Sequence, residues 1–159
     1  MFGLFRTPDV SHPQLGVLTW KNGCWRGEIS LPGCGRVPLV LAGSRKGPDA
    51  EALSHGMAVP NVLRSIQAHL EQALFEHHAS CAEAIRDGRL ELTDGKFREV
   101  ESPADALREA KLEAVLVVEL DGELATELCY KVPWDEEHTL SARFRGTRWI
   151  ELCGSTRVP

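Results

Sequence analysis

The sequence predicts an α+β protein in which helices pack on antiparallel sheet. Two groups of apolar segments, one toward each end of the chain, have the two-residue period of strands. Between them, apolar residues recur every three or four positions, which is typical of an amphipathic helix. A length of 159 residues and a hydrophobic fraction of 43% match one globular domain spanning residues 1–159.

The N-terminal third predicts a three-stranded antiparallel meander. An Asn22-Gly23 turn joins the first two strands, and a glycine-rich turn leads into the third. Pro38 lacks a backbone N–H, so we expect the third strand at an edge of the sheet. The predicted strands span residues 15–20, 24–31 and 37–41.

The middle of the chain predicts one long helix and one or two short ones. A short helix is expected over residues 48–53, and the long helix begins after Pro60 with Asn61 as its cap and ends at Asp87-Gly88. The apolar stripe of the long helix is formed by Leu63, Ile66, Leu70, Leu74, His77, Cys81 and Ile85.

A shorter helix is predicted over residues 103–110. Ser102 is a typical N-cap residue, Pro103 suits the first helical position, and Asp105 completes a variant of the capping box.

The C-terminal part predicts a four-stranded meander. From Leu112 onward the apolar period changes from that of a helix to that of strands, with turns at Asp121-Gly122 and at Gly146. The predicted strands span residues 112–120, 124–132, 139–144 and 148–152.

Charge and hydropathy exclude several classes of partner. The net charge is -5, and no basic stripe with interleaved aromatics is present, so we expect no nucleic-acid partner. The longest apolar run, residues 112–120, contains two Glu residues and is far short of the roughly 20 residues that span a bilayer. The N-terminal residues lack the apolar core of a signal peptide. We therefore expect a cytoplasmic protein that does not contact a membrane.

The five cysteines predict reduced thiols rather than a disulfide framework. Their number is odd and no C-x-x-C pair occurs, so the sequence predicts neither a zinc ribbon nor a bound cofactor or metal. Most of these thiols should be buried, because free cysteine is among the most buried residue types.

The densest polar segment predicts the candidate site. It is expected in the connection between two C-terminal strands and is formed by Trp134, Asp135, Glu136, Glu137 and His138. Carboxylates beside an imidazole could bind a divalent cation or act as general acid and base. In the structural alternative, Trp134 anchors the turn in the core, Asp135 caps it, and Glu136 and Glu137 face solvent.

Other candidate groups have structural explanations. His77 lies on the apolar stripe and is expected in the core with its ring nitrogens paired, whereas His69 and His78 are expected on the surface. The histidine spacing does not match a zincin helix. Residues 43–47 follow a strand and precede a helix but lack the pattern of a phosphate loop. Trp20 and Trp25 flank one turn and should form a cross-strand contact.

The segment from Val132 to Phe144, with the sequence VPWDEEHTLSARF, resembles the C-terminal signature of an uncharacterised bacterial domain family. The N-terminal hairpin, with Leu15 to Leu18 and Trp25-Arg26-Gly27, is similar to the opening of that family. The resemblance implies a small intracellular bacterial protein, related to immunity proteins that neutralise toxins of neighbouring bacteria. Ser141 stands where such relatives often have Gly.

Three functional hypotheses follow, of which the third is a constitutive subunit of a larger assembly with a large apolar interface. The first is a non-catalytic module that binds another protein, of the immunity type, with acidic and aromatic groups meeting a basic surface. The alternative is a metal-dependent hydrolase or other enzyme centred on Asp135, Glu136, Glu137 and His138. That alternative requires a concave pocket in which these residues meet donors from another element, such as His77 or His78.

Overall fold

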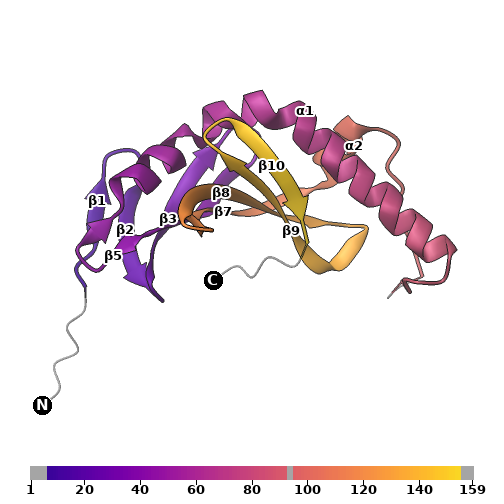
Figure 1. The fold of residues 1–159 in the computed structure, drawn as a ribbon, viewed down its shortest axis with the longest axis horizontal. Helices are drawn as coiled ribbons and strands as arrows, with labels where there is room; N and C mark the ends of the chain where they lie inside the picture. The colour runs from indigo at the N-terminus through magenta and orange to yellow at the C-terminus, as the bar shows by residue number, and fades with distance from the viewer. Residues whose placement is uncertain (1–6, 93–94, 155–159) are drawn as a thin grey trace, which may run out of the picture.

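The computed structural model describes residues 7–92 and 95–154. Within these residues the chain forms a large mixed sheet, a small two-stranded sheet and two helices, one of them long (Figure 1). The elements are, in chain order, β1 (Val10–His12), β2 (Gly16–Lys21), β3 (Cys24–Leu31), β4 (Gly35–Leu41), β5 (Gly43–Ser44), β6 (Gly47–Pro48), α1 (Ala50–Arg86), α2 (Pro103–Glu109), β7 (Lys111–Leu120), β8 (Glu123–Val132), β9 (Asp135–Arg145) and β10 (Arg148–Cys153).

The large sheet has the strand order β1-β2-β3-β4-β7-β8-β9-β10. Neighbouring strands are antiparallel except β4 and β7, which are parallel. The strands predicted in the C-terminal part correspond to β7, β8, β9 and β10. The predicted N-terminal meander corresponds to β2, β3 and β4, but β1 adds a fourth strand, so the grouping differs from the expected three plus four. The α+β class is confirmed, and the sheet is mostly antiparallel.

The position of β4 corrects the expectation drawn from Pro38. That residue was expected to place the strand at an edge, yet β4 lies inside the sheet between β3 and β7. Pro38 is opposite Glu28 of β3, whereas the pairing with β7 covers only Leu39 to Leu41. The missing N–H of Pro38 therefore lies outside the parallel ladder, which is why proline is tolerated there.

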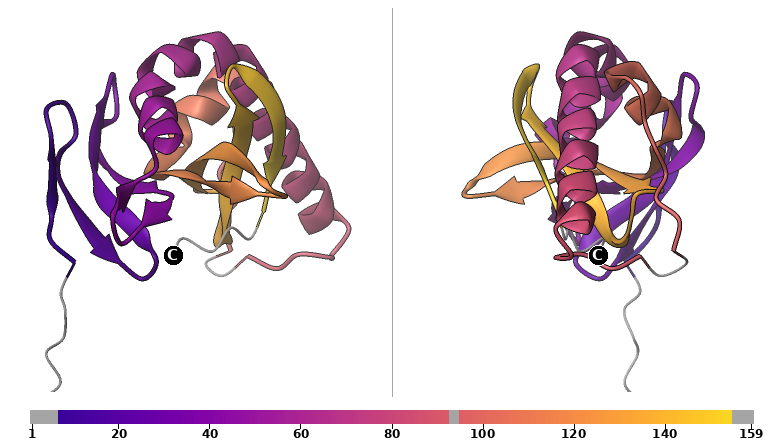
Figure 2. Two further views of the ribbon diagram at one scale, coloured as in Figure 1. Left: turned by 60° about the vertical axis from the view of Figure 1, so that its left-hand side comes forward. Right: turned by 90° about the vertical axis from the view of Figure 1, so that its right-hand side faces the viewer.

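A helical crossover explains the parallel pair. Parallel neighbours cannot be joined by a tight turn, and here α1 and α2 carry the chain back so that β7 runs in the direction of β4. Both views in Figure 2 show α1 lying over one face of the sheet. The carboxyl ends of β4 and β7 consequently lie side by side, next to the N-terminus of α1.

One long helix replaces the two helices expected on either side of Pro60. α1 is capped at Asp49, whose side chain accepts a hydrogen bond from the Glu51 N–H, and it continues through Pro60 to Arg86. Proline inside a helix removes one backbone hydrogen bond. The helix continues because its buried face is uninterrupted, and packing outweighs propensity in setting helix length. That face is formed by Ala52, Gly56, Val59, Val62, Ile66, Leu70, Leu74, His78 and Cys81.

Gly56 lets the first half of α1 approach the sheet closely. A Cβ atom at this position would lie 3.2 Å from Leu41 Cδ2. The helix backbone therefore packs directly on β4, and α1 then bends along its length over the sheet (Figure 1).

The shorter helix was predicted correctly. Ser102 is its N-cap and accepts a hydrogen bond from the Asp105 N–H, with Pro103 in the first turn. The pKa of Asp105 is lowered, first by a hydrogen bond from Ser102 and then by one from Arg108.

The main core lies between α1 and the face of the sheet that it covers. Alternate strand residues, among them Leu39, Leu41, Val115 and Leu128, are buried against the helix. A smaller cluster on the opposite face contains Val40, Ala114, Leu116 and Cys129. We call this second side of the sheet the open face, because neither helix covers it.

Neither described helix is long and apolar enough to cross a membrane. Residues 1–6, on which the expectation about a signal peptide depends, lie outside the described part of the chain.

Candidate functional site

The segment from Trp134 to His138 is mostly strand rather than connection. β8 and β9 are joined by a turn at Pro133 and Trp134, and β9 begins at Asp135, opposite Val132. Trp134 is 3% exposed, and its indole N–H donates a hydrogen bond of 3.1 Å to His77 Nδ1. The expectation that Trp134 anchors this turn in the core is confirmed.

Asp135 connects the turn to α1. Its Oδ1 accepts the backbone N–H of His138 at 3.2 Å and lies 2.9 Å from His138 Nδ1. Its Oδ2 lies 3.5 Å from His77 Nε2. One carboxylate thus contacts two imidazole rings, one from the long helix and one from its own strand.

The surroundings of His77 lower its pKa below the ordinary histidine value. Burial is the largest cause, Asp135 opposes it, and His138 and His78 lower the pKa further. Because the indole of Trp134 donates to Nδ1, this nitrogen acts as an acceptor and the ring proton lies on Nε2, facing Asp135.

Cys81 lies one helical turn beyond His77, with its Sγ 3.8 Å from His77 Nδ1. Cysteine, histidine and aspartate in this order resemble a nucleophile, a base and an orienting acid. Two observations argue against that role. Burial, aided by Asp135, raises the pKa of Cys81 to about 11, and the Trp134 N–H already occupies the nitrogen that would accept the thiol proton.

His78 is buried, contrary to the expectation that it lies on the surface. It is 5% exposed and stacks on Phe97 with ring centroids 4.9 Å apart, and it lies perpendicular to the ring of Trp134 with centroids 5.4 Å apart. Its Nε2 lies 3.0 Å from the carbonyl oxygen of Arg98. The helix rotates slightly relative to the predicted stripe, so His78 enters the core and His77 is half-buried. His69 is exposed, as predicted.

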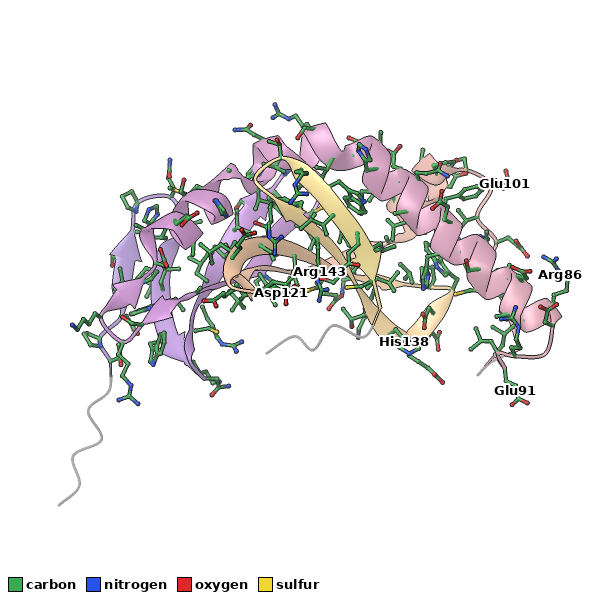
Figure 3. The ribbon with its side chains drawn as sticks, viewed as in Figure 1. Arg86, Glu91, Glu101, Asp121, His138 and Arg143 are labelled. Carbon is green, nitrogen blue, oxygen red and sulfur yellow. The ribbon has the colours of Figure 1, made fainter. Side chains whose placement is uncertain are left out.

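The structure brings some of the predicted site residues together and not others. Asp135 and His138 converge with His77, while Glu136 and Glu137 are exposed. Figure 3 shows His138 at the end of β9 that is remote from Arg143. The cavity beside this turn has a volume of only about 40 Å³. This cavity reaches Asp135 but neither His77 nor His138, and it is too small for a substrate.

A much larger cleft, of about 950 Å³, lies at the other end of β9. It is lined by the hairpin of β5 and β6, the first turn of α1, the β7–β8 turn and Arg145. The sequence analysis considered residues 43–47 only as a phosphate loop. The order of elements around these residues, a strand followed by a loop and a helix, indicates a ligand site better than the phosphate-loop pattern does. Ligands of α/β units bind at the carboxyl ends of parallel strands.

Acidic groups outnumber basic ones around this cleft. The carboxylates belong to Asp49, Glu51, Glu119 and Glu123, and the basic groups to Lys46, Arg145 and His55. Arg145 is held by Glu123 at 3.2 Å and by the carbonyl oxygen of Leu120 at 3.0 Å. The carboxylate of Asp49 caps the N-terminus of α1 and accepts the Glu51 N–H. This negative charge would repel a phosphate from the helix N-terminus.

Two buried nitrogen atoms beside the cleft lack partners. His55 Nδ1 and Arg145 Nε make no hydrogen bond within the described residues. Buried polar atoms are rarely left without a partner, and a ligand or water molecule that reached either atom would supply the missing hydrogen bond.

Comparison with known proteins identifies the family. No curated protein and no solved structure matches the chain. The model of a domain of unknown function, DUF6985, matches residues 15–158. That match covers the described strands from β2 to β10 and both helices, and we conclude that the chain belongs to the DUF6985 family.

Proposed function

We propose that the protein is a non-catalytic module that binds a basic segment of another protein in the cleft between α1, the β5–β6 hairpin and the β7–β8 turn. The observation that carries this proposal is the composition of the cleft. Its volume of about 950 Å³ suits a short stretch of polypeptide, and its lining has an excess of carboxylates.

The carboxylates differ in their availability. Asp49 is occupied as a helix cap and Glu123 pairs with Arg145. Glu119 makes no ion pair among the described residues, and Glu51 has only His55 at 3.9 Å. A Lys or Arg side chain of a partner would find Glu51 and Glu119 free to receive it.

The unpaired nitrogens favour a polypeptide over a simple cation. Arg145 Nε is a donor, and a peptide carbonyl is a matching acceptor; His55 Nδ1 can pair with either a peptide carbonyl or a peptide N–H, according to its tautomer. A metal ion or a small amine would leave these atoms unpaired. The excess of carboxylates also disfavours nucleic acid.

The class of partner comes from the resemblance to immunity-type bacterial domains. In that setting the protein acts in the bacterial cytoplasm, and its partner is a toxin with a basic surface. The exposed side chains of Glu136, Glu137 and His138, together with Trp134 and Asp135 at the opposite end of β9, are the competing candidate contact for such a partner.

The alternative, a metal-dependent hydrolase centred on Asp135, Glu136, Glu137 and His138, has less support. His77 meets Asp135, as that hypothesis required. The adjoining cavity of about 40 Å³ does not admit a substrate, and Glu136 and Glu137 are exposed.

A peptide-display selection tests the proposed function. Random peptides are selected on the wild-type protein, and their affinities are measured for a Glu51→Gln/Glu119→Gln variant. We expect selected peptides to be rich in Lys and Arg and to bind this variant at least about 10-fold more weakly, because each peptide loses ion pairs.

The matched control is a Glu136→Gln/Glu137→Gln variant, which loses the same charge at the other end of β9. Equal loss of affinity in both variants would show a general charge effect and would refute the cleft as the site. Loss only in the control would move the site to the Trp134–His138 segment.

A further inference from the structure

Three side chains with different metal-binding groups meet where α1 passes the start of β9. They are the imidazole of His77, the thiol of Cys81 and the carboxylate of Asp135. One ligand atom from each residue lies within 4.8 Å of the other two. From this geometry we propose that His77, Cys81 and Asp135 bind one zinc ion, which links the long helix to the β8–β9 turn.

The distances are close to those of a zinc site. Zinc bond lengths of about 2.0 to 2.3 Å place tetrahedral ligand atoms roughly 3.3 to 3.8 Å from one another. His77 Nε2 and Asp135 Oδ2 are 3.5 Å apart, and Cys81 Sγ is 3.8 Å from Nδ1, the other ring nitrogen of His77. Since one zinc ion binds only one of these nitrogens, binding requires the side chains to rotate from separations of up to 4.8 Å to the shorter distances of a zinc site.

The donor set selects zinc over the hard divalent cations. Calcium and magnesium prefer sites made of oxygen atoms, whereas thiolate and imidazole suit zinc. All three residues are partly shielded from solvent, and Asp135 is additionally held by the ring of His138 at 2.9 Å. Such an outer hydrogen bond orients a ligating carboxylate.

Zinc would change the hydrogen bonding of the indole. If the metal binds Nδ1 of His77, it displaces the Trp134 N–H directly. If it binds Nε2, the ring proton moves to Nδ1, and two N–H groups would then face each other. In both cases the hydrogen bond from the Trp134 N–H to His77 is lost. Metal binding can therefore be detected at Trp134, although this residue is not a ligand. A coordinated thiol also loses its proton.

The small cavity suggests what the ion does. The cavity beside the turn, of about 40 Å³, reaches Asp135 but neither His77 nor Cys81, so it can hold a water molecule near the carboxylate but no substrate. The ion therefore acts as a cross-link between α1 and β9, and its loading would stabilise the protein by mass action.

The experiment uses the reduced, chelator-treated full chain titrated with cobalt(II) and then zinc. We expect one equivalent of cobalt to give a thiolate charge-transfer band that zinc abolishes. Cys81→Ala should eliminate this band and weaken zinc binding at least about 10-fold, the smallest effect typical of changes around a metal site. Cys153→Ala and His69→Ala, which remove a thiol and an imidazole elsewhere, should leave both unchanged.

A second measurement does not depend on the folding of the cysteine variant. The indole N–H resonance of Trp134, assigned with Trp134→Phe, should shift when zinc is added to the wild-type protein. Absence of the charge-transfer band, equal zinc affinity of wild type and Cys81→Ala, or an unshifted Trp134 resonance at saturating zinc would each overturn the proposal. None of these outcomes bears on peptide binding in the cleft.

Discussion

Glu127 and Arg143 face each other across β8 and β9 on the open face of the sheet, with Arg143 Nε donating to Glu127 Oε1 over 2.9 Å. Ser141 donates to the other carboxylate oxygen at 2.8 Å, and Arg143 also reaches Glu151 on β10 at 3.0 Å. Glu127 is only 4% exposed, so its carboxylate makes hydrogen bonds with these partners in place of water.

Arg143→Ala should therefore destabilise the protein by roughly 3 kcal/mol, because it leaves a buried carboxylate without its counter-ion. This value is at the lower end of the range of about 3 to 5 kcal/mol for breaking a buried ion pair. The Arg143 side chain is 22% exposed, so water can partly take its place beside Glu127 in the variant. Urea denaturation measures the change. The control is Arg36→Ala, which removes an exposed pair with Glu28 and should change stability by less than about 1 kcal/mol. Equal effects of the two variants would contradict the structural role of Glu127.

Trp134→Ala should lower the free energy of unfolding by about 3 to 5 kcal/mol, because it removes a large buried ring. Trp134→Phe keeps an aromatic ring in the core but loses the hydrogen bond to His77, so it should lower the free energy of unfolding by about 1 kcal/mol. Thermal and chemical denaturation of both variants give the comparison. An unchanged melting temperature of Trp134→Ala would refute the anchoring role and favour a role for this residue in binding.

Ser102→Ala should destabilise α2 by about 1 kcal/mol, because the first turn loses its cap. The same change should raise the pKa of Asp105 toward its ordinary value, since the hydrogen bond from Ser102 is the largest cause of its lowering. NMR titration of the Asp105 side chain measures the second effect. Ser80→Ala, at an exposed position within α1, is the control and should change neither quantity appreciably.

Cys129 should make stability fall at alkaline pH. Its pKa is raised from 9.0 to about 12, chiefly by burial and then by Glu127. Above pH 9 the unfolded chain releases the thiol proton while the native protein keeps it, so unfolding becomes more favourable as pH rises toward 12. Denaturation between pH 8 and pH 11 should show that the free energy of unfolding falls less steeply with pH for Cys129→Ser than for the wild type. Identical slopes would exclude a contribution from this thiol.

In alkylation at pH 8, the exposed Cys34 should react before the buried Cys129.

Local signals in the sequence predicted the turns and caps well. Asn22 and Gly23 both have the positive φ angles that a tight hairpin turn requires, at 53° and 80°. Asp87 caps α1 and Gly88 follows with φ at 70°, as the predicted helix end required. These features depend on a few adjacent residues, whose side chains and backbone preferences determine them directly.

Features that depend on distant residues were not predicted. The sequence analysis placed a helix boundary at Pro60. The helix continues through this residue because α1 packs on β4, and the local sequence pattern does not show that packing. The partner of Trp134 is His77, 57 positions earlier in the chain. A rotation of the helix by a fraction of a turn decides whether His77 or His78 enters the core, and apolar periodicity does not resolve so small an angle.

The cleft was missed for the same reason. Residues 43–47 were recognised as a polar loop, but Glu119 and Arg145 join them only because β4 and β7 are parallel neighbours. Nothing in the separate strands indicates that pairing.

The parallel pairing of β4 with β7 also bears on how the chain is synthesised. The N-terminal strands leave the ribosome well before β7, and until β7 arrives one side of β4 has hydrogen-bonding groups with no neighbour. Exposed strand edges invite pairing with other chains, and pairing between distant segments is slow. In the nascent protein, Pro38 has no backbone N–H, so the unpaired side of β4 offers one hydrogen-bond donor fewer to another chain. A proline that looks misplaced in an interior strand can thus protect the chain from aggregation before its sheet is complete.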